Sequence, residues 1–233
     1  MKITVVYGSM RQSSTYNITK QFIDNLATEK SYIKEFFLPR DCPNFCRGCF
    51  RCFNDNTNCP DYKFINPIIK ALDEADLIIF SSPVYVCHVT GAMKSFLDHL
   101  AYRAIVHRPS ELMFKKQALA ISTAAGGGCK STNKDMLDSF FFMGIGKSHT
   151  YGTNVYASSW KDVSDELKLK IKKDVLKLSN KIKNNTTKKL VPPIKVKTFF
   201  YVSKTLHKKG SFTEVDTNYW REKGWLDKIK PWN

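Results

Sequence analysis

The chain has 233 residues, 42% of them hydrophobic, which predicts one domain or one domain plus an extension. No apolar run approaches the roughly 20 residues of a membrane span, and no apolar signal core follows Met1-Lys2, so we expect a cytoplasmic protein with no membrane span. The net charge of +16 comes from lysines that are spread along the chain and gather in its last third, which is typical of a solvated surface and favours no nucleic-acid partner.

The N-terminal segment predicts a strand, a turn and a helix in close succession. Residues 3–7 are a β-branched run suited to a buried strand, Gly8 turns the chain, and helical periodicity begins near Ser14. A loop before a helix presents free N–H groups and the positive end of the helix dipole, which together bind anions. The side chains that add hydroxyl donors and a permanent charge there are Ser9, Arg11, Ser14 and Thr15.

The glycine content of this loop indicates which phosphate ligand to expect. A dinucleotide site uses G-x-G-x-x-G to close the backbone on a pyrophosphate. This loop has Gly8 alone, with hydroxyl side chains in place of the other glycines, so a single terminal phosphate is favoured. The alternative is an ordinary capped turn with an incidental arginine, since serine-rich caps are common.

The rest of the chain alternates strands and helices. Strands are expected at residues 32–38, 77–80, 118–122 and 151–157, and helices at residues 65–72, 90–100, 136–141 and 163–182. This alternation predicts an open parallel sheet with right-handed crossovers and helices on both faces. Ligands of such sheets bind beyond the carboxyl ends of the strands. The loops at residues 9–15, 82–86 and 123–128 should therefore converge on one ligand.

The second and third of these loops suit a flat ligand. Ser82-Pro83-Val84-Tyr85 is a proline-stiffened turn whose aromatic ring can stack on the ligand. Gly126-Gly127-Gly128 lets the backbone pass close to it. The sequence that follows lacks the spacing of a P-loop, which argues against an ATPase.

A linker and an aromatic tail are expected after the last helix. Residues 184–189 and Pro192-Pro193 have the composition of a linker. The tail, residues 194–233, is too aromatic for a disordered end, so we expect it to pack on the core or on a second subunit. Residues 194–197 alternate like a strand, while a helix over residues 199–206 fits equally well.

Five motifs, in order, resemble those of one known family. They are Gly8-Ser9-x-Arg11-x-x-Ser14-Thr15, Cys46-x-Gly48-Cys49-x-x-Cys52, Ser82-Pro83-Val84-Tyr85, Met93-Lys94-Ser95-Phe96-Leu97-Asp98 and the glycine loop. Over residues 1–183 the chain resembles the flavodoxin-like NAD(P)H-dependent FMN reductases, including the iron-sulfur flavoprotein branch. The resemblance implies an α/β flavodoxin-like three-layer sandwich with a five-stranded parallel sheet in the order 2-1-3-4-5. It also implies an FMN-binding domain at residues 1–183 and a C-terminal extension at residues 184–233.

The resemblance further implies the cofactor and its contacts. FMN would place its phosphate on Ser9, Arg11, Ser14 and Thr15, and its ring against Pro83, Val84, Tyr85 and the backbone of Ala125, Gly126 and Gly127. His99 stands where many relatives have an arginine.

The implied activity is hydride transfer from NAD(P)H to the flavin, followed by electron transfer to a quinone, a flavin or another small-molecule acceptor. No catalytic side chain is required, because the cofactor carries the chemistry. Arg103 and Arg108 are predicted NADPH contacts, with surface charge at a dimer interface as the alternative. We expect a homodimer or homotetramer. The alternative function is a flavodoxin-like or iron-sulfur electron carrier without its own substrate turnover.

Seven cysteines without an export signal favour thiols, metal ligands or redox chemistry over a disulfide framework. The set Cys46-x2-Cys49-x2-Cys52-x6-Cys59 is too compact for two separated zinc-binding pairs, and thiolates at steps of three wrap naturally around a cubane cluster. The iron-sulfur flavoproteins that this loop resembles hold a [4Fe-4S] centre with such a set. Cluster-free thiols near the flavin, and zinc, are the alternatives. The remaining cysteines, Cys42, Cys87 and Cys129, are expected to be ordinary small residues.

Overall fold

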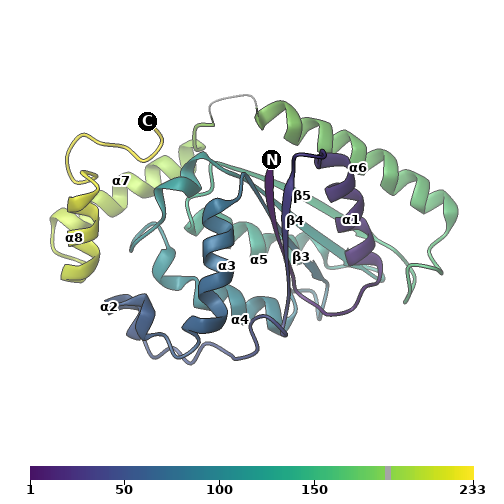
Figure 1. The fold of residues 1–233 in the computed structure, drawn as a ribbon, viewed down its shortest axis with the longest axis horizontal. Helices are drawn as coiled ribbons and strands as arrows, with labels where there is room; N and C mark the ends of the chain where they lie inside the picture. Colours follow the sequence, from purple (N-terminus) through teal and green to yellow (C-terminus); the bar gives the residue numbers. More distant parts are fainter. Residues whose placement is uncertain (187–189) are drawn as a thin grey trace.

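The computed structural model describes residues 1–186 and 190–233, and its centre is a five-stranded parallel sheet in the order β2-β1-β3-β4-β5 (Figure 1). The strands are β1 (Lys2–Tyr7), β2 (Tyr32–Phe37), β3 (Leu77–Pro83), β4 (Gln117–Ala124) and β5 (Lys147–Asn154). This order confirms the predicted flavodoxin-like fold. From β1 the chain moves to one side of the sheet to form β2 and then to the other side to form β3. The point between β1 and β3 is therefore the switch point of the sheet, where ligands of open parallel sheets bind.

Helices cover both faces of the sheet and make the structure three-layered (Figure 1). On one face, α1 (Ser14–Leu26) and α6 (Asp165–Thr186) enclose a core around Val5 and Ile79. On the other face, α3 (Tyr62–Glu74), α4 (Gly91–His99) and α5 (Cys129–Phe142) enclose a core around Phe80. Burial on both sides explains why β3 and β4 read as continuous apolar runs in the sequence.

The edge strand β5 differs from its predicted position. It runs from Lys147 to Asn154, whereas the sequence predicts a strand over residues 151–157. Only His149 and Tyr151 are buried in it, so its apolar signal is weak and the pairing with β4 decides where it lies. The residues after Asn154 are consequently a loop at the carboxyl edge of the sheet.

The segments between the main elements contain short helical turns. They are α2 (Arg51–Asn54), η1 (Asn56–Asn58), η2 (Ala101–Arg103) and η3 (Glu111–Lys115). The first two belong to the cysteine loop, residues 46–59, between β2 and α3. The other two follow α4 and lead into β4.

The tail forms two helices, α7 (Ile194–Lys208) and α8 (Glu214–Glu222), at one end of the molecule (Figure 1). The predicted helix is confirmed, and the alternative strand at residues 194–197 is wrong, because Val196 and Phe200 lie four residues apart on one buried face. A third core forms here. Trp220 of α8 and Trp225, which follows it, pack with Phe114 from the earlier part of the chain. The predicted linker begins too early, since α6 continues to Thr186, and residues 187–189 lie outside the described residues.

No helix within the described residues is both long and apolar enough to span a membrane.

Candidate functional site

The loops after β1, β3 and β4 meet around a cavity of about 200 Å³ at the carboxyl edge of the sheet, which we call the edge pocket. The predicted residues that line it are Ser9, Arg11, Ser14, Thr15, Pro83, Val84, Tyr85 and Ala125. Gly126 and Gly127 are exposed in the same loop and lie outside the lining. The convergence follows from the register, because β1, β3 and β4 are parallel neighbours whose ends share one edge.

One end of the edge pocket is suited to an anion. Helix α1 begins there, and Ser13 at its N-cap makes no side-chain capping hydrogen bond. In α4, by contrast, Thr90 Oγ1 accepts from the backbone N–H of Met93 at 3.1 Å. The first-turn N–H groups of α1 therefore remain available, and a phosphate satisfies such groups. Arg11 adds a cation beside them and donates to the carbonyl oxygen of Ser158.

The Thr15 hydroxyl has a partner within the protein. Thr15 Oγ1 lies 2.5 Å from Thr123 Oγ1, and this buried pair joins the start of α1 to β4. Each hydroxyl has one proton and two lone pairs, so one proton of the pair is still free to donate to a ligand. The pair thus fits an anion while fixing the distance between two walls of the pocket.

The rim beside Tyr85 is a tight and strained turn. Tyr85 N donates to His88 O at 2.9 Å, and His88 N donates to Tyr85 O at 3.0 Å. Between them, Val86 has φ 48° and Cys87 has φ 65°, as in a type I′ turn without its usual Asn-Gly. A non-glycine residue in this region costs roughly 1–3 kcal/mol, and such strain is concentrated at ligand sites.

The glycine loop supports this turn. Gly128 has φ +94°, and a Cβ added to it would lie 2.6 Å from Val84 Cγ1 and 3.0 Å from Cys87 Cα. A side chain at Gly128 would therefore push the turn away. A Cβ at Gly126 or Gly127 would meet no atom within 4 Å.

A fourth loop lines the edge pocket and was missed by the sequence analysis. Val155, Ala157 and Ser158, which follow β5, form its far wall. The predicted strand over residues 151–157 concealed this loop. The sequence analysis would have found this loop if it had placed the end of β5 at Asn154.

The predicted cysteine ligands surround a second cavity of about 330 Å³, which we call the cysteine cavity. The thiols that line it belong to Cys46, Cys49, Cys52 and Cys59, and all are free. Phe50 and Phe53 come from the same loop, and His99 from the end of α4. Cys42 is buried in the core and does not line this cavity. Burial raises its pKa, and Cys59 and Cys46 are near enough for their charges to raise it further.

Burial and neighbouring thiols both affect how these cysteines ionise. Burial, followed by the charges of Cys59, Cys46 and Cys49, raises the pKa of the Cys52 thiol to about 11. Burial also raises the pKa of Cys59. Neighbouring thiolates repel one another, and a bound metal removes that repulsion because it deprotonates its thiol ligands. The donor set therefore fits an iron-sulfur cluster.

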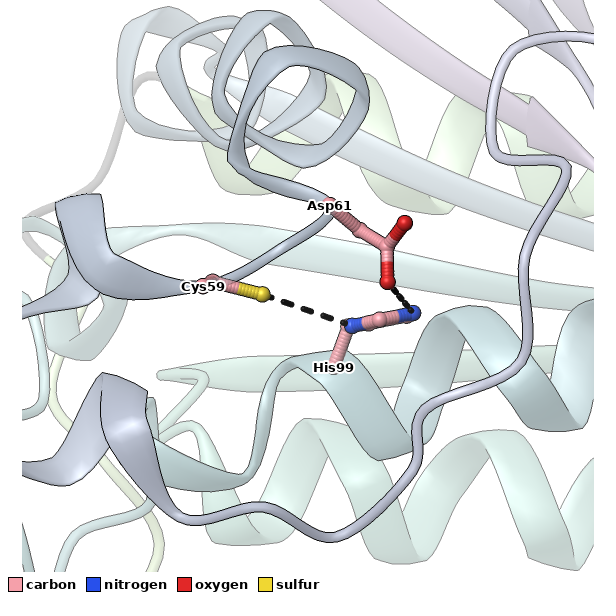
Figure 2. A group of neighbouring side chains, drawn as sticks. All are labelled: Cys59, Asp61 and His99. Carbon is pink, nitrogen blue, oxygen red and sulfur yellow. Dashed lines mark hydrogen bonds and ion pairs between the residues drawn. The ribbon is translucent and has the colours of Figure 1, made fainter.

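Figure 2 shows a buried group beside Cys59 that sequence spacing did not indicate. His99 Nε2 donates to the Asn44 carbonyl oxygen at 3.2 Å, so Nδ1 faces Cys59 Sγ at 4.0 Å. Asp61 accepts from Asn44 Nδ2 at 2.6 Å. The ligating atoms of Cys59, Asp61 and His99 lie within 4.8 Å of one another, an arrangement that also suits a single metal ion.

The two arginines predicted to contact NADPH are held inside the protein. Arg103 is buried and donates to Asp73 Oδ1. Arg108 donates to the buried carboxylate of Asp216 and to backbone carbonyls of the cysteine loop. Both guanidinium groups are largely buried and already paired with a carboxylate, which argues against a contact with NADPH.

The sheet order, the available helix N-terminus at its switch point and the cleft beside Tyr85 define a flavodoxin-like mononucleotide-binding protein. Residues 1–159 match the family described as NADPH-dependent FMN reductase, and the chain belongs to that family. The predicted family is confirmed, and the chain is an oxidoreductase with FMN as its cofactor.

Relatives include two iron-sulfur flavoproteins of Methanocaldococcus jannaschii. One is 25% identical over 165 residues, which are 69% of this chain and 82% of the relative. The other is 28% identical over 149 residues, which are 61% and 72% of the two chains.

Solved structures share the fold. An azoreductase from Bacillus anthracis str. Sterne has a TM-score of 0.62 at 13% identity, covering 78% of this chain and 99% of its own. An NAD(P)H:quinone oxidoreductase from Methanothermobacter marburgensis has a TM-score of 0.60 at 12% identity, covering 81% and 98%.

Proposed function

We propose that this protein accepts hydride from NAD(P)H on a bound FMN and passes the electrons to a small acceptor such as a quinone or a free flavin. The observation that carries the proposal is the edge pocket, where an uncapped helix N-terminus and a cavity beside Tyr85 lie together in a chain of the FMN reductase family. FMN supplies the redox chemistry when bound.

The residues of the edge pocket divide the work of binding. Ser9, Arg11, Ser14 and Thr15 would hold the phosphate, with Arg11 supplying the charge and the start of α1 the N–H groups. The ring would lie against Pro83, Val84 and Tyr85 and the backbone of Ala125, Gly126 and Gly127. The rigid turn after Tyr85 keeps this side of the pocket from collapsing, because its backbone is tied across the turn.

The cysteine loop would hold a [4Fe-4S] cluster through Cys46, Cys49, Cys52 and Cys59. Two features support this proposal: the four thiols line one cavity, and the relatives are named iron-sulfur flavoproteins. Held by these thiols, such a cluster would supply one-electron transfer.

We also propose a two-part chain that assembles as a homodimer or homotetramer. Residues 1–183 would bind FMN, and residues 184–233 would form the extension. Support for assembly comes from Tyr85, which lines the pocket, and from Val86 and Tyr156, which adjoin lining residues in sequence; they expose 54%, 95% and 76% of their surface. Such an apolar rim suits a second copy that covers the flavin ring.

The test is a visible spectrum of anaerobically purified protein, with counts of iron and acid-labile sulfide. The expected result is a yellow-brown protein that bleaches when NAD(P)H is added without oxygen. A colourless protein that does not take up FMN would refute the flavin site. Flavin without iron would refute the cluster alone.

A one-electron carrier is the second candidate, and the exposed cysteine cavity favours it as a route for electrons. Steady oxidation of NAD(P)H with a soluble quinone or free flavin would exclude a pure carrier. Reduction by NAD(P)H that stops after one equivalent would favour it.

A further inference from the structure

The C-terminal extension holds one short segment of the preceding chain, residues 106–109, by its backbone carbonyls. His207 Nε2 donates to Val106 O at 3.1 Å, and Trp220 Nε1 donates to His107 O at 2.7 Å. The hydroxyl of Tyr219 donates to Pro109 O at 2.6 Å. Side chains from both α7 and α8 therefore set the position of this segment.

The same segment is locked by a buried carboxylate. Asp216 of α8 is 0% exposed, and its oxygens lie 2.9 Å from His107 Nδ1 and 2.7 Å from Arg108 Nη1. A buried ion pair is weak support for stability, because desolvation offsets the attraction, but it specifies one arrangement. Breaking it by removing one partner leaves an uncompensated buried charge.

Arg108 then reaches from this segment to the cysteine loop. Its Nη1 donates to Phe53 O at 2.6 Å, and its Nη2 donates to Cys52 O at 2.7 Å. The edge of the Phe53 ring meets the His107 ring, with centroids 4.6 Å apart. Helix α2 also lies close to α8 itself, so Arg108 and His107 lie between the cysteine loop and the extension.

We propose that Asp216 and Arg108 are positioning residues for the cysteine loop, so that the extension orders the thiols that receive the cluster. The proposal rests on the proposed function for the cluster, but the ordering of the loop can be measured without it. A guanidinium holds the carbonyls of Cys52 and Phe53 in one geometry because its donors form a rigid planar fork. Asp216 Oδ1 accepts from Nη1 as well and so helps to orient the guanidinium.

The pair also adds charge beside the cysteine loop. Arg108 is permanently positive and touches the backbone of a proposed ligand residue, whereas Asp216 is negative and compensates it. A nearby positive charge favours the more negative, reduced state of a cluster, and a nearby negative charge disfavours it. Removing either residue should therefore shift the reduction potential, in opposite directions.

The first test is hydrogen exchange of peptides from residues 46–60 in the full-length protein. Arg108→Gln and Asp216→Asn should each speed exchange there by roughly tenfold, since each removes charge-assisted hydrogen bonds. Glu222→Gln, an exposed carboxylate change on the same helix, is the control and should leave it unchanged. Unchanged exchange in both variants would overturn the positioning role.

The second test is the midpoint potential of the reconstituted cluster. Arg108→Gln should lower it and Asp216→Asn should raise it, while both lower iron content and keep FMN. Shifts of the same sign would indicate general disruption and overturn the electrostatic part. If the unchanged protein binds no iron, the proposed cluster fails, and the exchange measurement still decides whether the extension orders the loop.

Discussion

The edge pocket and the cysteine cavity are built in opposite ways. The edge pocket uses loops that directly follow β1, β3, β4 and β5, so its position follows from the sheet. The cysteine cavity uses one long loop and the C-terminal end of α4. Arg108 binds the backbone of that loop, and Asp216 of the extension binds Arg108. A site at strand ends inherits its geometry from a regular element, whereas a site on a loop needs separate supports.

The two sites should therefore respond independently to substitution. A change in the extension should affect the cysteine cavity and spare FMN. A change at the carboxyl edge of the sheet should do the reverse. The predictions below test this separation.

Trp220→Ala should have the largest effect. Trp220 is fully buried, stacks on Phe200 with centroids 4.7 Å apart and donates to His107. Loss of such a side chain costs roughly 3–5 kcal/mol. We expect a lower free energy of unfolding in urea and a lower iron content. FMN binding, measured by the quenching of FMN fluorescence, should be retained.

The control for this variant is Leu169→Ala on α6, where the side chain is 61% exposed. Its free energy of unfolding should change by less than about 0.5 kcal/mol. If Trp220→Ala lost FMN as readily as iron, the two sites would not be independent.

Gly8→Val should disrupt the edge pocket and spare the cysteine cavity. A Cβ at Gly8 would lie 3.0 Å from Thr90 Oγ1 and 3.1 Å from Met93 Cβ, so valine forces β1 away from α4. Overpacking of this kind costs roughly 1–3 kcal/mol. FMN titration should show lost affinity at unchanged iron content.

Gly91→Ala is its matched control, because a Cβ there meets no atom within 4 Å. It should bind FMN normally. Equal losses in the two variants would contradict the steric explanation.

Arg11→Gln should weaken FMN about tenfold, since the exposed guanidinium supplies one charged contact to the phosphate. Riboflavin, which lacks the phosphate, should bind both proteins equally. Isothermal titration with both ligands measures the difference. Equal weakening of riboflavin would mean that Arg11 contacts the ring or shapes the pocket.

The smallest effect is a pH dependence confined to the cysteine cavity. Because the pKa of Cys52 is raised to about 11, its thiol is protonated at neutral pH in the metal-free protein. Below that pKa, alkylation of Cys52 by iodoacetamide should become about tenfold faster for each unit by which the pH is raised, since the thiolate is the nucleophile. Peptide mass spectrometry follows the reaction, and a rate independent of pH would contradict the assigned environment.

Much of the edge pocket was predictable because its residues are contiguous with strands. Gly8 directly follows an apolar run, and β3 continues only three residues beyond its apolar run to Pro83, so the sequence locates these strand ends to within a few residues. The loop after β5 was missed because an edge strand with one buried face has a weak pattern, and its pairing with β4 decides its bounds. The Thr15–Thr123 hydroxyl pair joins residues far apart in sequence and has no local signal.

Two arginines show what sequence-based prediction cannot reach. Arg103 and Arg108 have the chemistry of phosphate contacts, and nothing near them in sequence indicates otherwise. Their carboxylate partners, Asp73 and Asp216, come from other helices. The surroundings of a charged side chain depend on which elements pack together.

By itself, the sequence determined the alternation of strands and helices, three of the four loops that meet at the carboxyl edge, and the cysteine spacing. Each of these depends on residues close together in the chain, where apolar periodicity and turn chemistry act. Only the tertiary structure decided that His99 faces Cys59 and that α8 reaches the cysteine loop through Arg108. Those contacts join segments whose meeting depends on the burial of whole helices, which no local pattern encodes.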